Sequence, residues 1–147
     1  MKEVLIIHYS QTGQLTTILE NIASSFEGEA VRISRYEIVP EPRYEFPWKP
    51  QRFFDVFPES FLQIPAEFHP PGQDILGKKY DLVILGYQVW FLTPSIPINS
   101  FLKSANASKL LRNTPVVTVV AARNMWIQAQ EKVKRLLIAV DAKLVGH

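Results

Sequence analysis

Apolar and polar positions along the first 26 residues change from a continuous run to a helical repeat. Residues 4–7 are Val-Leu-Ile-Ile, a run too short for a helix and rich in β-branched side chains, so it predicts a buried strand. A polar loop at residues 10–14 follows. Beyond the loop, apolar side chains recur three or four positions apart, which predicts a helix with one apolar face. That face comprises Leu15, Ile18, Leu19, Ile22, Ala23 and Phe26.

Four later segments also have the pattern of strands. Residues 30–34 alternate loosely and include an arginine, which predicts an exposed strand near the edge of the sheet. Residues 80–86 form an apolar run ending in glycine, as in a parallel strand covered on both faces. Residues 115–121 predict a fourth strand, since proline is acceptable at its start. Residues 142–147 begin a fifth strand that stops short, so we expect a fragment of a longer protein or an edge covered by a partner.

Two further helices follow from the pattern. One begins near Pro97, with Ser95 as its N-cap. The other covers residues 125–140, and its outer face, which we expect to be solvated, carries Lys132, Lys134 and Arg135. Strands that alternate with helices predict a parallel sheet with helices on both faces. The length fits a single domain, residues 1–147.

Residues 36–73 differ in composition from the rest of the chain. They hold eight of the eleven prolines and nine aromatic side chains. Proline this dense argues against a long helix or a central strand, whereas so many aromatics argue against a disordered linker. We expect an ordered insert packed on the domain, with one or two helical turns near Pro58. It either completes the core or forms a lid over a ligand or a surface for a partner.

Composition and charge exclude several classes of protein. The chain is 47% apolar and 20% charged, with a formal charge of +2, which gives no support for binding to nucleic acid or membranes. It has no cysteine, so disulfides, thiolate nucleophiles and cysteine-ligated metals are excluded. The sequence also lacks a long apolar run and the layout of a secretory signal, so we expect a cytoplasmic protein.

Ionisable side chains give no catalytic or metal-binding constellation. His8, His69 and His147 lack the spacing of metal ligands, so no metal site is predicted. His8 is interpreted as a hydrogen-bonded residue at the end of the first strand. No pair of carboxylates and no nucleophile with a base stands out, and no catalytic residue is assigned.

The loop before the first helix has the chemistry of an anion-binding site. The start of a helix leaves backbone N–H groups without partners and carries a partial positive charge. Ser10, Thr12 and Thr16 can add hydroxyl donors, and Gly13 allows close approach of the backbone. The loop contains no Lys or Arg, so recognition would rest on neutral donors. The alternative is an ordinary turn in which Ser10 or Thr12 is the N-cap of the helix.

The sequence Ser10-Gln11-Thr12-Gly13 at the end of a first strand resembles the FMN phosphate loop of flavodoxin-like proteins, whose pattern is Ser/Thr-x-Thr-Gly. This resemblance implies a three-layer α/β fold with sheet order 2-1-3-4(-5) and FMN as cofactor. The residues that it assigns to the phosphate loop are Ser10, Gln11, Thr12, Gly13, Gln14 and Leu15.

A second resemblance lies between residues 80 and 105. A strand ending in glycine, an aromatic loop at residues 87–93 and a proline-flanked helix ending in Phe-Leu are similar to the flavin-contacting segment of quinone and FMN reductases. Those sequences often have proline where this chain has Gln88. The resemblance places the flavin ring between this loop and the one after the fourth strand. The implied contacts are Gln88, Val89, Trp90, Phe91, Arg123, Asn124 and Trp126.

Three functions remain open at this point. The first is an FMN-dependent oxidoreductase that uses NAD(P)H to reduce a quinone or another small electron acceptor. The second is a flavodoxin-type electron carrier, although a sequence pI near 8.9 does not fit the usual acidic carrier. The third is a ligand-free interaction module, and a homodimer is compatible with any of the three. The insert and loop together also resemble flavodoxin-like proteins associated with dialkylresorcinol synthesis.

Overall fold

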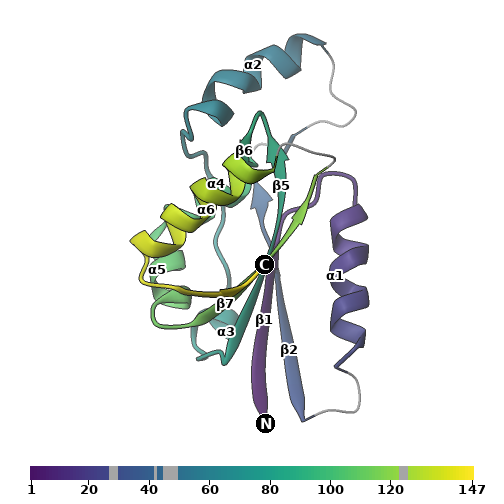
Figure 1. Cartoon of the computed structure of the whole chain (residues 1–147), viewed down its shortest axis with the longest axis vertical. Helices are drawn as coiled ribbons and strands as arrows, with labels where there is room; N and C mark the ends of the chain where they lie inside the picture. The colour runs from purple at the N-terminus through teal and green to yellow at the C-terminus, as the bar shows by residue number, and fades with distance from the viewer. Residues whose placement is uncertain (27–29, 42, 45–49, 123–125) are drawn as a thin grey trace.

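The computed structural model describes residues 1–26, 30–41, 43–44, 50–122 and 126–147. Within these residues, no helix combines the length and the apolarity that crossing a lipid bilayer requires. The chain forms three layers, with helices on both faces of one main sheet (Figure 1).

Five parallel strands make up the main sheet. They are β1 (Lys2–His8), β2 (Val31–Glu37), β5 (Leu82–Trp90), β7 (Pro115–Ala121) and β8 (Lys143–Gly146). Their spatial order is β2-β1-β5-β7-β8, which is 2-1-3-4-5 when these strands are counted along the chain. The predicted order and the predicted edge position of the second strand are therefore confirmed. The segment at residues 142–147 forms the fifth strand, paired with β7.

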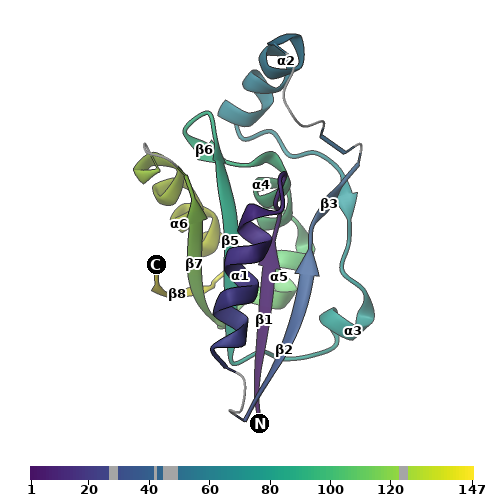
Figure 2. The same cartoon turned by 90° about the vertical axis from the view of Figure 1, so that its right-hand side faces the viewer.

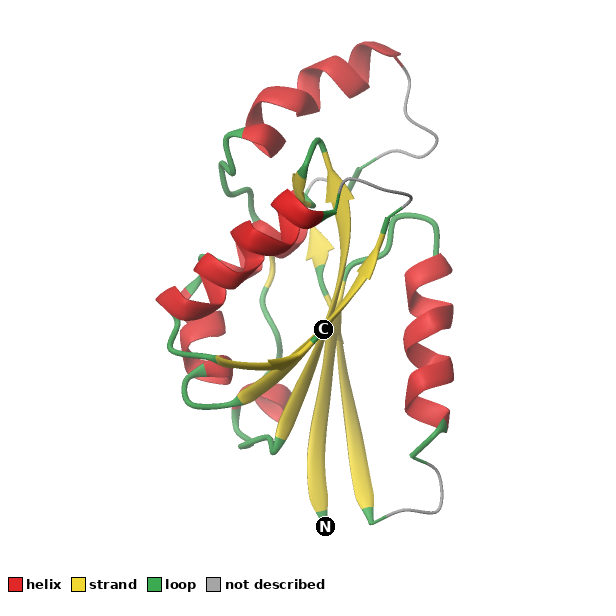
Figure 3. Ribbon diagram, viewed as in Figure 1, coloured by secondary structure: helices red, strands yellow, loops and turns green. Residues whose placement is uncertain are grey.

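The helices divide unequally between the two faces of the sheet, as Figure 3 shows. Helix α1 (Gln14–Ser24) covers one face. The other face carries α4 (Ile96–Leu102), α5 (Ala105–Leu111) and α6 (Ile127–Ala139). The short helix α3 (Gln73–Leu76) precedes β5, and α2 (Pro50–Phe61) lies beyond the ends of the strands.

Alternate residues of β1 supply the two halves of the core. Val4 and Ile6 pack under α1 together with Leu15 and Leu19, whereas Leu5 faces the opposite layer. Each such side chain contributes about 1.5–3 kcal/mol when it is fully buried, so a strand covered on both faces is a major source of stability. Of the predicted apolar face of α1, Ile18 is 38% exposed and does not belong to the core.

The insert contains a longer helix than its prolines predicted. We expected one or two turns near Pro58, but α2 has 12 residues and Pro58 lies inside it. The expectation failed because Pro50 begins the helix, where a missing N–H costs little, and Pro58 lies in its last turns. The Pro58 carbonyl still accepts a hydrogen bond from the Leu62 N–H at 3.0 Å.

Two short strands close the base of the insert. Strands β3 (Val39–Pro40) and β4 (Phe68–His69) pair in antiparallel fashion. The Tyr36 hydroxyl on β2 donates to the His69 carbonyl oxygen at 2.7 Å. Through these contacts the insert leaves the edge strand β2, crosses the ends of the strands and returns to β2.

The third strand of the sheet extends farther than predicted. Residues 87–93 were expected to form a loop, but β5 continues to Trp90 and returns through β6 (Thr93–Pro94). Phe91 and Leu92 form the two-residue turn, with φ values of 53° and 62°. Such turns normally use Asn or Gly. The Thr93 hydroxyl donates to the Trp90 carbonyl oxygen at 2.6 Å and helps to hold the strained turn.

Candidate functional site

The carboxyl ends of β1, β5 and β7 lie at one edge of the sheet, next to the start of α1 (Figure 2). Strand order reverses direction between β1 and β5, because β2 lies on one side of β1 and the later strands lie on the other. In open parallel sheets, ligands bind at such a reversal. The carboxyl ends of these strands are therefore the candidate binding site.

Gly13 sets the geometry of the loop before α1. It occupies the N-cap position with a φ of 86°, in the left-handed region, so the expectation that Ser10 or Thr12 is the N-cap is wrong. A Cβ at Gly13 would meet no atom within 4 Å, so glycine is needed for its conformation and not for space. The Gly13 N–H donates to the Ser10 hydroxyl oxygen at 3.0 Å, and the Gln14 N–H donates to that of Thr12 at 3.4 Å.

The first turn of α1 leaves two backbone donors open. The first regular helical bond runs from the Thr17 N–H to the Gly13 carbonyl oxygen. In the described part of the chain, the N–H groups of Leu15 and Thr16 have no acceptor. Open amides at a helix N-terminus are the donors that a phosphate group accepts most readily.

Gln88 connects this loop to β5. Its side-chain carbonyl oxygen accepts a hydrogen bond from the Gln11 N–H at 3.2 Å. Gln88 stands where the quinone and FMN reductases that this segment resembles often have proline. Its side chain joins the first loop to β5. The structure brings Gln11 and Gln88 together, as predicted from their positions at the strand ends.

His8 lies beneath the first turn of α1 and is only 6% exposed. Its Nε2 lies 3.0 Å from the Thr16 hydroxyl. Its Nδ1 is buried and has no hydrogen-bond partner among the described residues. The prediction that His8 is hydrogen-bonded therefore holds for one of its two ring nitrogens. Burial lowers the pKa of His8 from its ordinary value, although Glu37 and Glu20 act in the opposite direction. We assign the tautomer with its proton on Nε2, because it leaves no buried N–H unpaired. Nε2 then donates to Thr16 and leaves that hydroxyl proton available to a ligand.

Trp90 and Phe91 are covered by neighbouring aromatic rings. Trp90 is 8% exposed and meets the rings of Tyr9 and Tyr44 edge to face, at centroid distances of 5.8 and 5.1 Å. Phe91 meets Phe57 of α2 in the same way at 4.9 Å. Both rings therefore pack against other parts of the protein, and their contact with a flavin stays a prediction.

Trp126 packs against His147. Its ring is 4.9 Å from that of His147, and both line a cavity of about 480 Å³ between α6 and β8. Arg123 and Asn124, predicted to flank the flavin ring, lie outside the described residues. Among the described residues, no group of three His, Asp or Glu side chains is placed to hold a metal ion.

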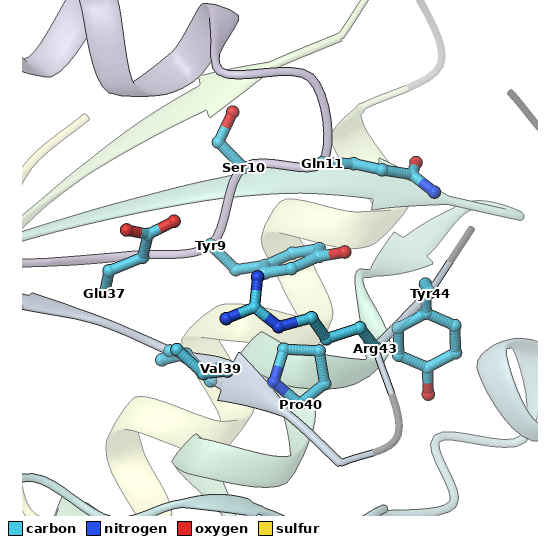
Figure 4. A pocket seen from close by; sticks show the side chains of 9 residues that line it. Tyr9, Ser10, Gln11, Glu37, Val39, Pro40, Arg43 and Tyr44 are labelled. Carbon is cyan, nitrogen blue, oxygen red and sulfur yellow. The ribbon is translucent and has the colours of Figure 1, made fainter. Parts of the chain in front are cut away.

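A polar pocket of about 170 Å³ adjoins the first loop on the β2 side (Figure 4). It is lined by Tyr9, Ser10, Gln11, Glu37, Ile38, Val39, Pro40, Arg43 and Tyr44. Burial raises the pKa of Tyr9 to about 12, with Tyr44 and Glu37 adding to the rise and Arg43 opposing it. The sequence pattern did not single out Tyr9, Glu37, Arg43 or Tyr44, because it gives no sign that the insert returns to the first loop.

Comparisons with known proteins address the fold. No model of a protein family matches the chain, and neither does any curated protein sequence. A flavoprotein from Lactobacillus acidophilus, solved in complex with FMN, superposes with a TM-score of 0.74 at 18% identity, covering 99% of this chain and 91% of that one. The chain has a flavodoxin-like fold. The fold class predicted from the phosphate-loop resemblance is confirmed.

Two further structures have this flavodoxin-like fold. A candidate flavoprotein from Bacteroides eggerthii gives a TM-score of 0.75 at 17% identity, covering 99% of this chain and 86% of that one. Oxidised flavodoxin 1 from Bacillus cereus gives a TM-score of 0.59 at 14% identity, covering 99% and 82%. At identities this low, the likeness concerns the fold.

Proposed function

We propose that this flavodoxin-like protein binds FMN and acts as an oxidoreductase that reduces a quinone or another small acceptor with electrons from NAD(P)H. The observation that carries the proposal is the start of α1, where Gly13 turns the chain and the amides of Leu15 and Thr16 lack acceptors among the described residues. FMN is also the ligand of the Lactobacillus acidophilus flavoprotein. A cytoplasmic location and a small-molecule acceptor are parts of the same proposal.

The residues present fit a phosphomonoester. The open amides supply two donors. The hydroxyls of Ser10, Thr12 and Thr16 accept in their present hydrogen bonds, so each can still donate its proton to a phosphate oxygen. The dipole of α1 favours a negative charge at this point. His8 fixes the orientation of the Thr16 hydroxyl through its Nε2–H.

The strand ends would position the ring system. A bound flavin supplies the hydride and electron chemistry, and the protein contributes placement and electrostatics. Gln88 holds the first loop against β5, so the phosphate loop and the end of β5 keep a fixed separation. The predicted ring contacts Val89, Trp90, Phe91, Arg123, Asn124 and Trp126 remain part of the proposal.

A ligand-free interaction module is the second candidate. It is favoured by the hydrogen bonds through which Ser10 and Thr12 already satisfy the amides of Gly13 and Gln14. A flavodoxin-type electron carrier gains no specific support from the structure.

Titration with FMN separates these candidates. The purified protein is mixed with FMN, and the absorbance and fluorescence of the flavin are followed. We expect saturable binding, and then oxidation of NADPH or NADH only when a quinone and the FMN-loaded protein are both present. Binding without turnover would leave the electron carrier, and the absence of binding would leave the interaction module.

A further inference from the structure

The polar pocket beside the phosphate loop contains a cation that the loop itself lacks. Arg43 lines this pocket together with Ser10 and Gln11. Figure 4 shows its side chain extending from the insert past the ring of Tyr9, with the guanidinium on the side of the pocket where Glu37 lies. Among the described residues that line the pocket, Arg43 is the only one with a positive charge.

The insert holds this arginine in place. Its neighbour Tyr44 packs edge to face on Trp90 at 5.1 Å, which fixes the backbone at residues 43–44 against the end of β5. The pairing of Val39 with His69 anchors the same segment on its other side. The backbone that carries Arg43 is therefore held by packed structure, although the side chain itself is exposed, and this lowers the entropy lost when the arginine binds an anion.

The charge balance of the pocket leaves Arg43 available to bind an anion. Glu37 lines the same pocket, but in the described part of the chain no carboxylate oxygen lies within 4 Å of the guanidinium nitrogens of Arg43. The nearby Arg35 is already paired with Glu20, at 2.6 Å. A phosphate at the start of α1 would bring up to two negative charges to the rim of a pocket in which Arg43, the one cation of the described lining, has no carboxylate within 4 Å among the described residues.

We propose that Arg43 is a specificity residue that binds the phosphate of the flavin and selects the phosphorylated cofactor over riboflavin. The inference rests on the proposed function and adds to it a cation contributed by the insert. Arginine suits this role because its planar group can donate two parallel hydrogen bonds to phosphate oxygens. The loop sequence predicts that neutral donors alone bind the phosphate. With Arg43 as a further donor, that prediction is incomplete.

The test compares FMN and riboflavin binding in two variants with the same change of charge. Arg43→Gln removes the pocket cation, and Arg135→Gln removes an exposed arginine from the outer face of α6. We expect Arg43→Gln to weaken FMN binding roughly tenfold, the size typical of a charge-assisted hydrogen bond, and to leave riboflavin binding unchanged. Arg135→Gln is expected to bind both ligands as the wild type does.

Glu37→Gln provides a test with the opposite sign. Removing the carboxylate that shares the pocket is expected to strengthen FMN binding several-fold and to leave riboflavin binding unaltered. If the wild type binds FMN and Arg43→Gln binds it equally well, the role of Arg43 is refuted and the proposed function stands. If the wild type binds no FMN, both are refuted. Unchanged thermal unfolding of each variant excludes loss of fold as the cause.

Discussion

At the scale of single residues, backbone conformation and burial determine what a side chain does more than its residue type alone. Gly13 is required because φ is 86° at the start of α1, and His8 matters because it is buried with one nitrogen unpaired. The sequence identified Gly13 correctly, since a glycine between a strand and a helix is a strong signal. It could not show the unpaired nitrogen of His8, which depends on the packing of α1 over β1.

The first residue-scale prediction concerns Gly13. A side chain there is strained because L-residues avoid the left-handed region, so Gly13→Ala is expected to lower the free energy of unfolding by about 1 kcal/mol. Gly13→Asn is the matched control and is expected to lose less, since asparagine tolerates this conformation better. Urea unfolding of both variants measures the difference, and equal stability of Gly13→Ala and the wild type would contradict the assignment of strain.

A second prediction follows from the depressed pKa of His8. The unfolded chain takes up the proton near pH 6.5 while the folded protein resists it, so stability contributed by neutral His8 is lost as pH falls below that value. The free energy of unfolding of the wild type should therefore decrease between pH 7.5 and pH 5.5. His8→Gln should show a shallower slope.

The control for this pH dependence is His69→Gln. His69 is exposed on β4 and is not buried against α1. Comparison of the two variants separates the effect of burying a histidine beneath α1 from the effect of removing any histidine. If His8→Gln retains the full slope, another group is responsible for the pH dependence.

At the scale of elements, continuous and periodic patterns predicted β1, α1 and β7 correctly, whereas the length of the helix in the insert and the end of β5 were predicted wrongly. The segment after Gly86 contains no Gly, Asn or Pro where the chain turns at Phe91 and Leu92, so its sequence lacks a hairpin signal. Prolines in α2 obscured a helix because their effect depends on where in the helix they fall.

The docking of α2 gives the prediction that belongs to this scale. The buried Ser60 hydroxyl lies 3.1 Å from both the Trp90 carbonyl oxygen and the Thr93 hydroxyl, and so fastens α2 to the hairpin of β5 and β6. Ser60→Ala is expected to cost roughly 1–2 kcal/mol and to speed proteolysis within α2. The exposed neighbour Glu59→Ala is the control. Equal rates of cleavage for the two variants would show that this contact does not hold the helix.

At the scale of the whole molecule, the alternation of strands and helices predicted a parallel sheet, and right-handed connections allow few arrangements of its strands. The resemblance to flavodoxin-like proteins selected among these the order that the structure shows. The same rule predicts that the ends of β1 and β5 meet, and Gln11 and Gln88 are indeed joined there. The approach of Arg43 to the first loop could not be predicted, since proline and aromatic content does not encode which surface an insert covers. The contact between Trp126 and His147 could not be predicted either, since it depends on the packing of α6 against β8.

The central claim is that the open amides at the start of α1 hold the phosphate of a flavin. The most direct measurement is the ¹⁵N-resolved NMR spectrum of the protein during addition of FMN and, separately, of riboflavin. The account predicts large shifts of the Leu15 and Thr16 amide signals with FMN and much smaller shifts of the same signals with riboflavin. The claim would be contradicted if the Leu15 and Thr16 signals stayed unchanged at saturating FMN. It would also be contradicted if only residues lining the cavity between α6 and β8 shifted.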